Sequence, residues 1–301
     1  MSINTGNFAK AVAPGYRKVF FGTLRDHPTE YDKFMNISTS QRAYEEEFKV
    51  AGLGLLAAKP EGTSVTYDDA IEGNSKRFTH TAAGLGFRIT EEMFEDDLYD
   101  LVGKKMAKSL AQSVANRCEV DGFSVLNNAF STSYIGFNAS ESLCSTSHTL
   151  LGGGTVANRP TADTDLSLTA LQAALESGAN TVNERNIPVL LKYKHLFVGP
   201  SFMWVAKELL GSELKPYTTD NEINPVKDEG LTWSLCHYFT DPDQFFLATD
   251  KDFHNVDFIW RRKPRYDASD DFDTGDAKNK VSIRTSFGFT DWRGWYGSQG
   301  A

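Results

Sequence analysis

The sequence predicts an α+β protein of one large domain or two medium ones. Three observations support this fold class. A long amphipathic helix is expected in residues 91–129, apolar residues and turn signals in residues 46–90 suggest a β-hairpin, and strand-like segments fill the chain after residue 230. A chain of 301 residues is long enough to bury a substantial core.

The helix of residues 91–129 has the clearest pattern in the chain. Thr90 is suited to cap it, and acidic residues fill its first turns, where they complement the helix dipole. Its apolar residues recur mostly every three or four positions: Phe94, Leu98, Leu101, Val102, Met106, Leu110, Val114 and Cys118. If helical throughout, it would span roughly 60 Å. Shorter helices are predicted in residues 168–182 and 202–210, with Gly211 just after the second.

The first 45 residues carry many aromatic side chains in polar sequence without a sustained period, apart from a weak helical pattern near residues 29–35. We therefore expect an extended arm that lies on another surface. In residues 46–90, strands are predicted at 48–56, 64–68 and 76–81, separated by turns. The result is a long hairpin with little core of its own.

The last part of the chain is predicted to be mainly β. A short buried strand is expected at residues 195–198, and further strands are expected at residues 231–237, 244–248, 256–262 and 280–289. The last two bracket an acidic loop, residues 267–276.

Composition argues against several classes of protein. The net charge of −9 disfavours a protein that mainly grips nucleic-acid phosphates. Cys118, Cys144 and Cys236 are too few and too widely spaced for a disulfide scaffold or a zinc site, so buried thiols are expected. The first residues do not resemble a signal peptide, and no apolar run is long enough to span a bilayer.

No set of residues forms a coherent catalytic centre, and no cofactor is expected. Ser201 lies between a predicted strand and a predicted helix, as a hydrolase nucleophile does, but Met203 replaces the glycine of that motif. A local helix cap explains Ser201 better. The acidic loop has no register that fits an EF-hand, and no histidine pair has zinc-hydrolase spacing. Trp292 and Trp295 are expected to pack against a sheet, with Arg293 in an ion pair.

An ordered series of short motifs runs through residues 40–301. The motifs are Gly52-Leu-Gly-Leu-Leu56, Glu61-Gly62, Tyr67-Asp-Asp69, Leu85-Gly-Phe-Arg-Ile-Thr-Glu-Glu92, Cys144-Ser-Thr-Ser-His148, Leu168-Thr-Ala-Leu171, Phe197-Val-Gly-Pro200 and Asp291-Trp-Arg-Gly294. In this order they resemble the major capsid proteins of tailed double-stranded DNA phages, which have the Hong Kong 97 phage fold. The resemblance is closest to the Mu-like prophage major head subunits.

The resemblance implies an L-shaped subunit with four parts. They are an N-terminal arm (1–45), an extended E-loop hairpin (46–90), a peripheral domain (91–166 and 251–290, with the spine helix at 91–129 and a tip loop at 263–279) and an axial domain (167–250 and 291–301). Such subunits assemble through hexamers and pentamers into an icosahedral shell around double-stranded DNA. The expected location is the virion, after assembly in the cytoplasm of the bacterial host.

The expected partners are many copies of the same chain, a portal, scaffolding or cement proteins, and packaged DNA held without sequence readout; no membrane is expected. The residues expected at contacts between subunits are Phe20, Phe21, Leu53, Leu55, Leu56, Lys59, Tyr67 and Arg77. Some relatives join a hairpin lysine to a neighbour's asparagine. Because the acidic tip has no asparagine before Asn279, that bond is not carried over. A long charged leader is also missing before the arm, so no scaffold domain is expected in this chain.

Two alternatives remain open at this point. One is another phage structural protein, such as a tail tube or decoration subunit, which the long helix disfavours because those proteins are mostly β. The other is a hydrolase that uses Ser201.

Overall fold

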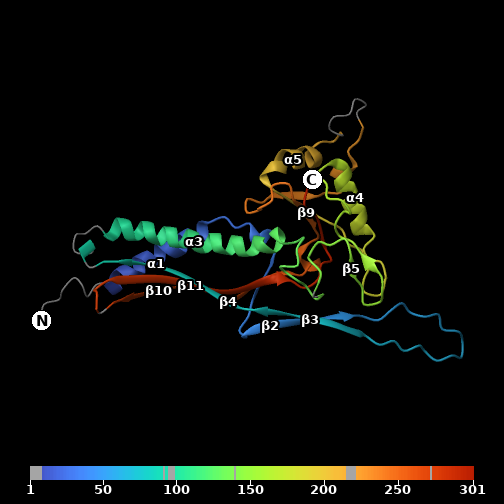
Figure 1. Cartoon of the computed structure of the whole chain (residues 1–301), viewed down its shortest axis with the longest axis horizontal. Helices are drawn as coiled ribbons and strands as arrows, with labels where there is room; N and C mark the ends of the chain where they lie inside the picture. Colours follow the sequence, from blue (N-terminus) through green and yellow to red (C-terminus); the bar gives the residue numbers. More distant parts are fainter. Residues whose placement is uncertain (1–8, 91, 94–98, 139, 215–221, 272) are drawn as a thin grey trace.

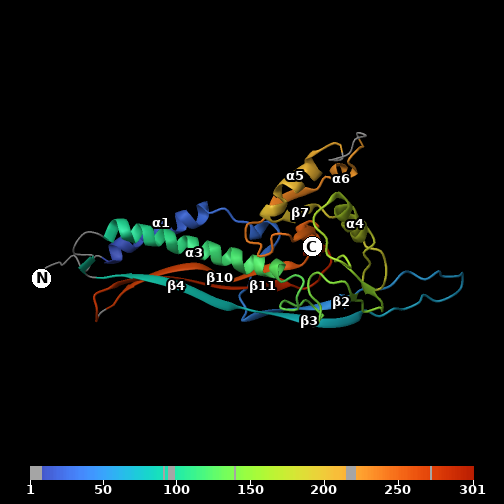
Figure 2. The same cartoon turned by 45° about the horizontal axis from the view of Figure 1, so that its top comes forward.

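The computed structural model describes residues 9–90, 92–93, 99–138, 140–214, 222–271 and 273–301. The molecule is elongated. A long layer of helices on a sheet forms one end, a compact body of helices and a second sheet forms the other, and a hairpin projects past that body (Figure 1, Figure 2). Each part draws on separate stretches of the chain.

The long layer is built on a four-stranded sheet. Its strands run in the order β1 (Asn36–Thr39), β10 (Val256–Asp270), β11 (Ala277–Phe289) and β4 (Thr81–Ile89), which makes β4 an edge strand. Helix α3 (Tyr99–Asn127) lies along one face of this sheet, with helix α1 (Ala9–Asp26) beside it (Figure 2). The predicted long helix is thus confirmed over Tyr99–Asn127, while residues 91 and 94–98 of that prediction lie outside the described residues.

The core of the layer forms where alternate sheet residues meet one stripe of α3. The buried side chains at this contact include Leu110, Val114, Phe258, Trp260, Val281 and Ile283. Gly103 and Gly122 reduce the helix propensity of α3, but they allow close packing. A Cβ at Gly103 would overlap the Tyr16 ring, and one at Gly122 would overlap Tyr31. Both glycines therefore serve the packing of the N-terminal segment against α3.

The prediction of an extended N-terminal arm is wrong for residues 9–26, which form helix α1. Tyr16, Phe20 and Leu24 recur every four residues and face the core of the layer. This short apolar stripe indicates a helix, but it is hard to recognise in the sequence because other aromatic residues surround it. After α1, a 3-10 turn η2 (Tyr31–Lys33) falls within the weak helical pattern near residues 29–35, and β1 follows it.

The compact body contains a second four-stranded sheet. Its order is β12 (Trp295–Ser298), β9 (Phe245–Ala248), β7 (His195–Val198) and β8 (Thr232–Leu235). Three helices accompany it: α4 (Leu168–Ala179), α5 (Met203–Gly211) and α6 (Pro225–Asp228). The remaining short elements are the paired strands β5 (His148–Thr149) and β6 (Thr155–Val156) and the 3-10 turns η3 (Pro200–Phe202) and η4 (Lys251–Phe253).

The sequence pattern predicted most of the strands and helices of the compact body. The strand at residues 195–198 is confirmed, and β8 and β9 lie inside their predicted ranges. Ser167 caps α4 by accepting a hydrogen bond from the backbone N–H of Ala170. Helix α4 ends three residues earlier than predicted, and Gly211 is the last residue of α5 rather than the residue after it.

Strands β10 and β11 extend well beyond their predicted limits. They pair as far as Asp270 and Ala277, so most of the predicted tip loop, residues 263–279, is strand. The charged segment after Trp260 lacks apolar alternation, and two register shifts interrupt its pairing. Because backbone pairing continues in spite of this composition, the strand could not be recognised from side-chain pattern alone.

The projecting hairpin consists of β2 (Tyr44–Ala51) and β3 (Ile71–Thr79), which pair antiparallel. Residues 52–70 connect them without regular structure, so the strand predicted at residues 64–68 is wrong. The predicted hairpin also ends too late, because residues 81–89 form β4 and pair with β11 in the long sheet. The hairpin thus leaves the layer at its edge and extends past the compact body (Figure 1).

In strand β2 a charged side chain faces inward and its apolar neighbours face solvent, which is the reverse of the usual arrangement. Lys49 is buried, whereas its neighbours Phe48 and Val50 are exposed. The Nζ atom of Lys49 lies 2.8 Å from the Oε1 atom of Glu184, and Arg293 contacts the same oxygen at 2.5 Å. Arg293 also pairs with Asp291 at 2.9 Å. A buried ion-pair cluster of Lys49, Glu184, Arg293 and Asp291 therefore anchors the hairpin to the compact body.

Glu184 is the centre of this anchor. Burial alone would raise the pKa of its carboxyl group. Hydrogen bonds from Lys49 and the Leu151 backbone N–H, together with the charge of Arg293, outweigh burial and hold that pKa below its ordinary value. The carboxylate is thus stabilised as an anion inside the protein.

A second contact ties down the connecting segment. Arg185 lies 3.5 Å from the Asp68 carboxylate and donates a hydrogen bond to the Asp69 carbonyl oxygen at 2.5 Å. Nearby, Gly73 of β3 packs closely against Leu151 and Lys49. The direction in which the hairpin projects is therefore fixed at both of its strands.

We expect Glu184→Gln to destabilise the protein by about 3 kcal/mol, because Lys49 and Arg293 would remain buried with less compensating charge. Urea denaturation followed by circular dichroism measures this loss. Glu61→Gln is the control, since Glu61 is exposed and makes no ion pair among the described residues. Coinciding denaturation curves for the two variants would contradict a stabilising role for the anchor.

A second titratable group lies where the hairpin meets the long sheet. Asp257 of β10 is flanked by Asn36 of β1 and Gly288 of β11. Burial, assisted by the negative charge of Glu47 on β2, raises the pKa of Asp257 to about 7. The folded protein therefore binds a proton here more tightly than the unfolded chain does.

Because the folded pKa is the higher one, the stabilisation from this proton is full below about pH 4 and is lost as the pH rises through 7. We expect Asp257→Asn to remove this loss, so that the variant is more stable than the wild type by about 1–2 kcal/mol at pH 8 and not at pH 4. Melting temperatures across this range test it, with exposed Asp273→Asn as control. A difference that does not depend on pH would refute the assignment.

Candidate functional site

The segment that connects β2 and β3 carries apolar side chains that no other described part of the chain covers. Leu53, Leu55, Leu56 and Tyr67 are 65%, 80%, 101% and 91% exposed, respectively. Phe48 on β2 adds to this surface at 63% exposure. Isolated exposed apolar residues are ordinary, but several of them together on one projecting hairpin make this surface the candidate functional site.

The structure separates the residues expected at subunit contacts into two groups. Those on the hairpin are accessible: Leu53, Leu55, Leu56, Lys59, Tyr67 and Arg77. Arg77 lies 3.3 Å from Glu46 and stacks over the Tyr44 ring, so it also supports the hairpin itself. Phe21 on α1 is half-exposed. Phe20 is fully buried against Tyr266 in the chain's own core, so its predicted contact with a neighbour is wrong.

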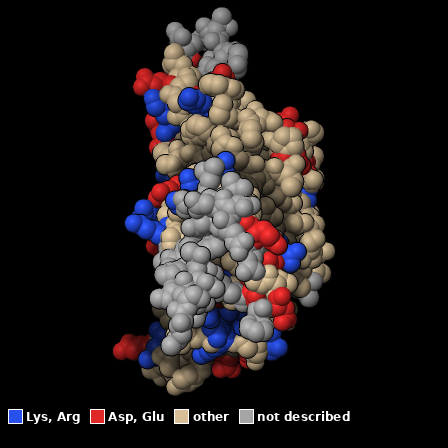
Figure 3. Space-filling model, turned by 90° about the vertical axis from the view of Figure 1, so that its left-hand side faces the viewer, with Lys and Arg blue, Asp and Glu red and all other residues tan. Residues whose placement is uncertain are grey.

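Charges are unevenly distributed over the long layer. Seen end-on, Lys and Arg side chains gather near the lower edge of the molecule, beside smaller acidic groups (Figure 3). The acidic tip between β10 and β11 is partly neutralised, because Lys278 pairs with Asp271 and Arg88 lies 3.6 Å from Asp276. Two carboxylates of the tip, those of Asp271 and Asp276, are thus paired within the chain.

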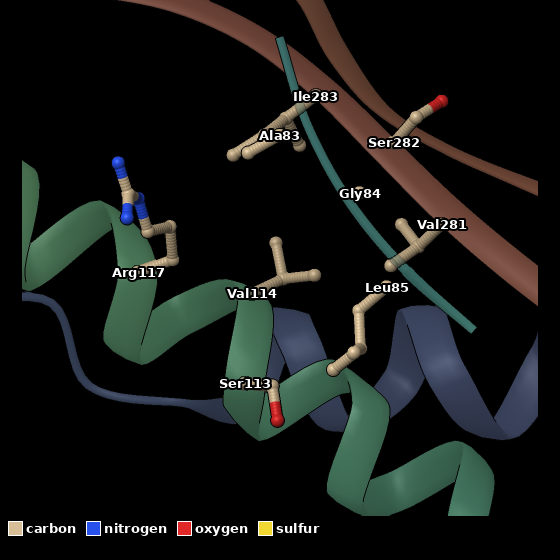
Figure 4. A pocket seen from close by; sticks show the side chains of 9 residues that line it. All are labelled: Ala83, Gly84, Leu85, Ser113, Val114, Arg117, Val281, Ser282 and Ile283. Carbon is tan, nitrogen blue, oxygen red and sulfur yellow. The ribbon is translucent and has the colours of Figure 1, made fainter. Parts of the chain in front are cut away.

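An open groove of about 250 Å³ runs between α3 and the edge of the long sheet. Ala83 and Leu85 of β4, Val114 of α3, and Val281 and Ile283 of β11 line it, and their side chains point toward the groove (Figure 4). Ser282 points to the other face of the sheet (Figure 4). The groove is mostly apolar and has no group of polar side chains suited to catalysis.

The chemistry considered from the sequence is not assembled in the structure. Ser201 is exposed in the turn η3, and no described histidine or carboxylate hydrogen-bonds its hydroxyl. Across the described ranges, no group of three histidine, cysteine or acidic side chains is placed to hold a metal ion. No helix among the described residues is long and apolar enough to cross a membrane.

The tryptophan-rich C-terminal segment packs inside the protein, as predicted. Trp295 is fully buried beside Phe197, and Arg293 forms the predicted ion pairs. Trp292 stacks on His148 with a centroid separation of 4.2 Å. The three cysteines are buried as free thiols, and burial raises the pKa of each.

The sequence did not indicate the polar cluster around His148. The Nε2 atom of His148 lies 2.8 Å from the Oδ1 atom of Asn158, and its Nδ1 atom lies 3.1 Å from Glu141. Asn158 donates to the Leu143 and Trp295 carbonyl oxygens. Lys49 and Glu184 were likewise missed as partners. A lysine between two apolar strand residues was the one available signal for Lys49.

Comparisons with known proteins agree with this architecture. A search of curated protein sequences found no match. The structure resembles the capsid of cyanophage P-SCSP1u (TM-score 0.55, 13% identity, 91% of this chain and 88% of the other). It also resembles the procapsid of bacteriophage JBD30 (0.52, 13%, 98% and 76%) and a virus-like particle from Pyrococcus furiosus (0.52, 11%, 94% and 97%). At these identities the likeness establishes the fold, which is of the Hong Kong 97 type.

The sequence itself supplies the stronger finding, because the sequence model of a family described as phage capsid protein matches residues 74–298. This range includes the long layer after β3, the compact body and most of the C-terminal segment. A structural role follows, and both the Ser201 hydrolase and the tail or decoration alternatives are set aside. The chain belongs to the phage capsid protein family.

Proposed function

We propose that this chain is the major head subunit of a tailed phage and assembles through hexamers and pentamers into an icosahedral shell around double-stranded DNA. The single observation that carries the proposal is the projecting hairpin, whose apolar end is uncovered while its base is held by the buried anchor of Lys49, Glu184, Arg293 and Asp291. A segment held out in this way can reach a second subunit without losing its place on the first.

The proposed parts of the subunit follow the structure with adjusted limits. Residues 44–79 act as the E-loop, and α1 and β1 belong to the long layer rather than to a free arm. The long layer acts as the peripheral domain and the compact body as the axial domain, which would meet its copies at the symmetry axes. The motif at residues 85–92 further supports membership of the Mu-like prophage major head group.

The energy for assembly would come mainly from the hairpin. Full burial of a leucine side chain contributes roughly 1.5–3 kcal/mol. Leu53, Leu55 and Leu56 together would therefore contribute on the order of 5 kcal/mol to each contact, before the cost of ordering the segment is subtracted. Contacts of this size are strong enough in large numbers and weak enough singly to let misplaced subunits dissociate.

The remaining partners are proposed from charge and from the nature of the assembly. The net charge of −9 suits a wall that encloses DNA without adhering to it. A portal and scaffolding or cement proteins would complete the particle, and assembly would take place in the cytoplasm of the bacterial host.

The test of this function is negative-stain electron microscopy of the purified protein across a series of salt and protein concentrations. We expect rings of five and six subunits or closed isometric shells. Analytical ultracentrifugation of the same samples should give particles far heavier than one chain. A chain that remains monomeric at every concentration and salt level would refute self-assembly.

The hairpin's part in this function is tested by a triple variant, Leu53→Asp, Leu55→Asp and Leu56→Asp. Charged side chains there would have to be buried at the contact, so we expect shells to disappear while the subunit remains folded. The matched control changes the same three residues to Met, which keeps the surface apolar and should preserve assembly. Normal shells from the aspartate variant would exclude the hairpin as the main contact.

A further inference from the structure

The face of the long sheet that points away from α3 carries three arginines close together. Figure 4 shows Ser282 directed to this face, while Val281 and Ile283 point toward the helix. Strand alternation places Arg284 on the same face as Ser282. Arg262 of β10 is the direct cross-strand partner of Arg284 and donates a hydrogen bond to the Ser282 hydroxyl at 3.0 Å.

The backbone around these arginines is irregular. The pairing of β10 with β11 shifts register between Trp260 and Arg262 and again between Arg262 and Arg265. Such bulges change where side chains point and often occur beside functional sites. Here they bring Arg261 and Arg262, consecutive residues, to the neighbourhood of Arg284. Burial and the charges of Arg284 and Arg261 together keep the pKa of His80 below its ordinary value.

These arginines lack counter-ions in the part of the chain that the structure describes. None of the side chains of Arg261, Arg262 and Arg284 makes an ion pair with a described residue. The nearby carboxylate of Glu45 is engaged by Arg42 at 3.7 Å and by the Ser40 hydroxyl. The Nε atoms of Arg261 and Arg262 are buried without an acceptor. Like charges directly opposite each other on a sheet are destabilising, so the cluster calls for an anion.

Access to the cluster is open on the side of β4. The β4 residues paired with Arg284, Ser282 and Lys280 are Ala82, Gly84 and Gly86, all exposed. A Cβ at Gly86 would lie 2.7 Å from the Asn279 carbonyl oxygen, so a larger residue there would clash with β11. Small residues therefore leave the surface of β4 open beside the three guanidinium groups. An extended segment can lie across this surface.

We propose that Arg261, Arg262 and Arg284 form an anion-binding site that receives carboxylates from the projecting hairpin of a second copy of this chain. The inference rests on the proposed function and adds the receiving surface and its chemistry. Guanidinium groups bind carboxylates in paired, directional hydrogen bonds. The contact would therefore fix the position of the hairpin, while its leucines supply the apolar burial.

Charge complementarity points to the hairpin as the occupant. It carries four carboxylates that make no ion pair among the described residues, namely those of Glu47, Glu61, Asp69 and Glu72. A nucleic acid fits less well, because Asp267 and Glu45 border the cluster and the whole chain has a net charge of −9. A hairpin carboxylate needs only one or two guanidinium groups, whereas a nucleic acid would bring a run of phosphates past both acidic side chains.

The first experiment removes the site's charge with Arg262→Gln and Arg284→Gln together. We expect the protein concentration at which half the subunits assemble to rise about tenfold or more, as a loss of 1.4 kcal/mol per contact would produce. Added salt should weaken wild-type assembly more than assembly of this variant. The matched control, Lys18→Gln with Lys108→Gln, removes the same charge from exposed helix positions and should assemble like the wild type.

The second experiment identifies the occupant by charge exchange. Arg284→Glu should block assembly, and one of Glu47→Arg, Glu61→Arg, Asp69→Arg or Glu72→Arg should restore it when combined with Arg284→Glu. Failure of all four to restore assembly would overturn the hairpin as the source of the carboxylate. More DNA bound by wild-type subunits than by the Arg262→Gln, Arg284→Gln variant would overturn it in favour of nucleic acid.

The outcomes for the inference and for the proposed function are distinct. If the wild type assembles and the glutamine variant assembles at the same concentration with the same salt dependence, the anion site alone is refuted. If the wild type stays monomeric under every condition in ultracentrifugation, self-assembly is refuted and the anion site with it.

Discussion

The arrangement of the subunit depends on a small set of charges buried where three distant stretches of chain meet. Lys49 comes from the hairpin, Glu184 from the loop after α4, and Arg293 from the C-terminal segment. Such a cluster contributes less net stability than apolar packing would, because its charges must be taken out of water. Its value is geometric, since only one arrangement of the three segments satisfies all of its partners.

This constraint explains why the hairpin exposes apolar residues. Burying Lys49 turns Phe48 and Val50 outward, because neighbouring strand residues face opposite sides. The polar anchor and the uncovered apolar surface are therefore two results of one strand orientation. A partner that covers the outward face of β2 would bury Phe48 and Val50, which are exposed in the isolated chain.

The sequence predicted the elements whose pattern is local. Helix α3 and strands β7, β8 and β9 followed from periodic apolar residues. Helix α1 was missed because its stripe of Tyr16, Phe20 and Leu24 is short and set among other aromatic residues. The inward side chain of Lys49 and the length of β10 could not be predicted, since each depends on a partner distant in sequence.

The open edge of the long sheet has a consequence for the chain before it meets any partner. An edge strand of nine residues with one side unpaired is a template on which another chain could build a continuous sheet, the first step toward fibres. Gly84 and Gly86 are poor strand formers, and Arg88 places a charge on the same strand. The chain thus keeps this edge unfavourable for indiscriminate pairing, at the cost of a weaker strand.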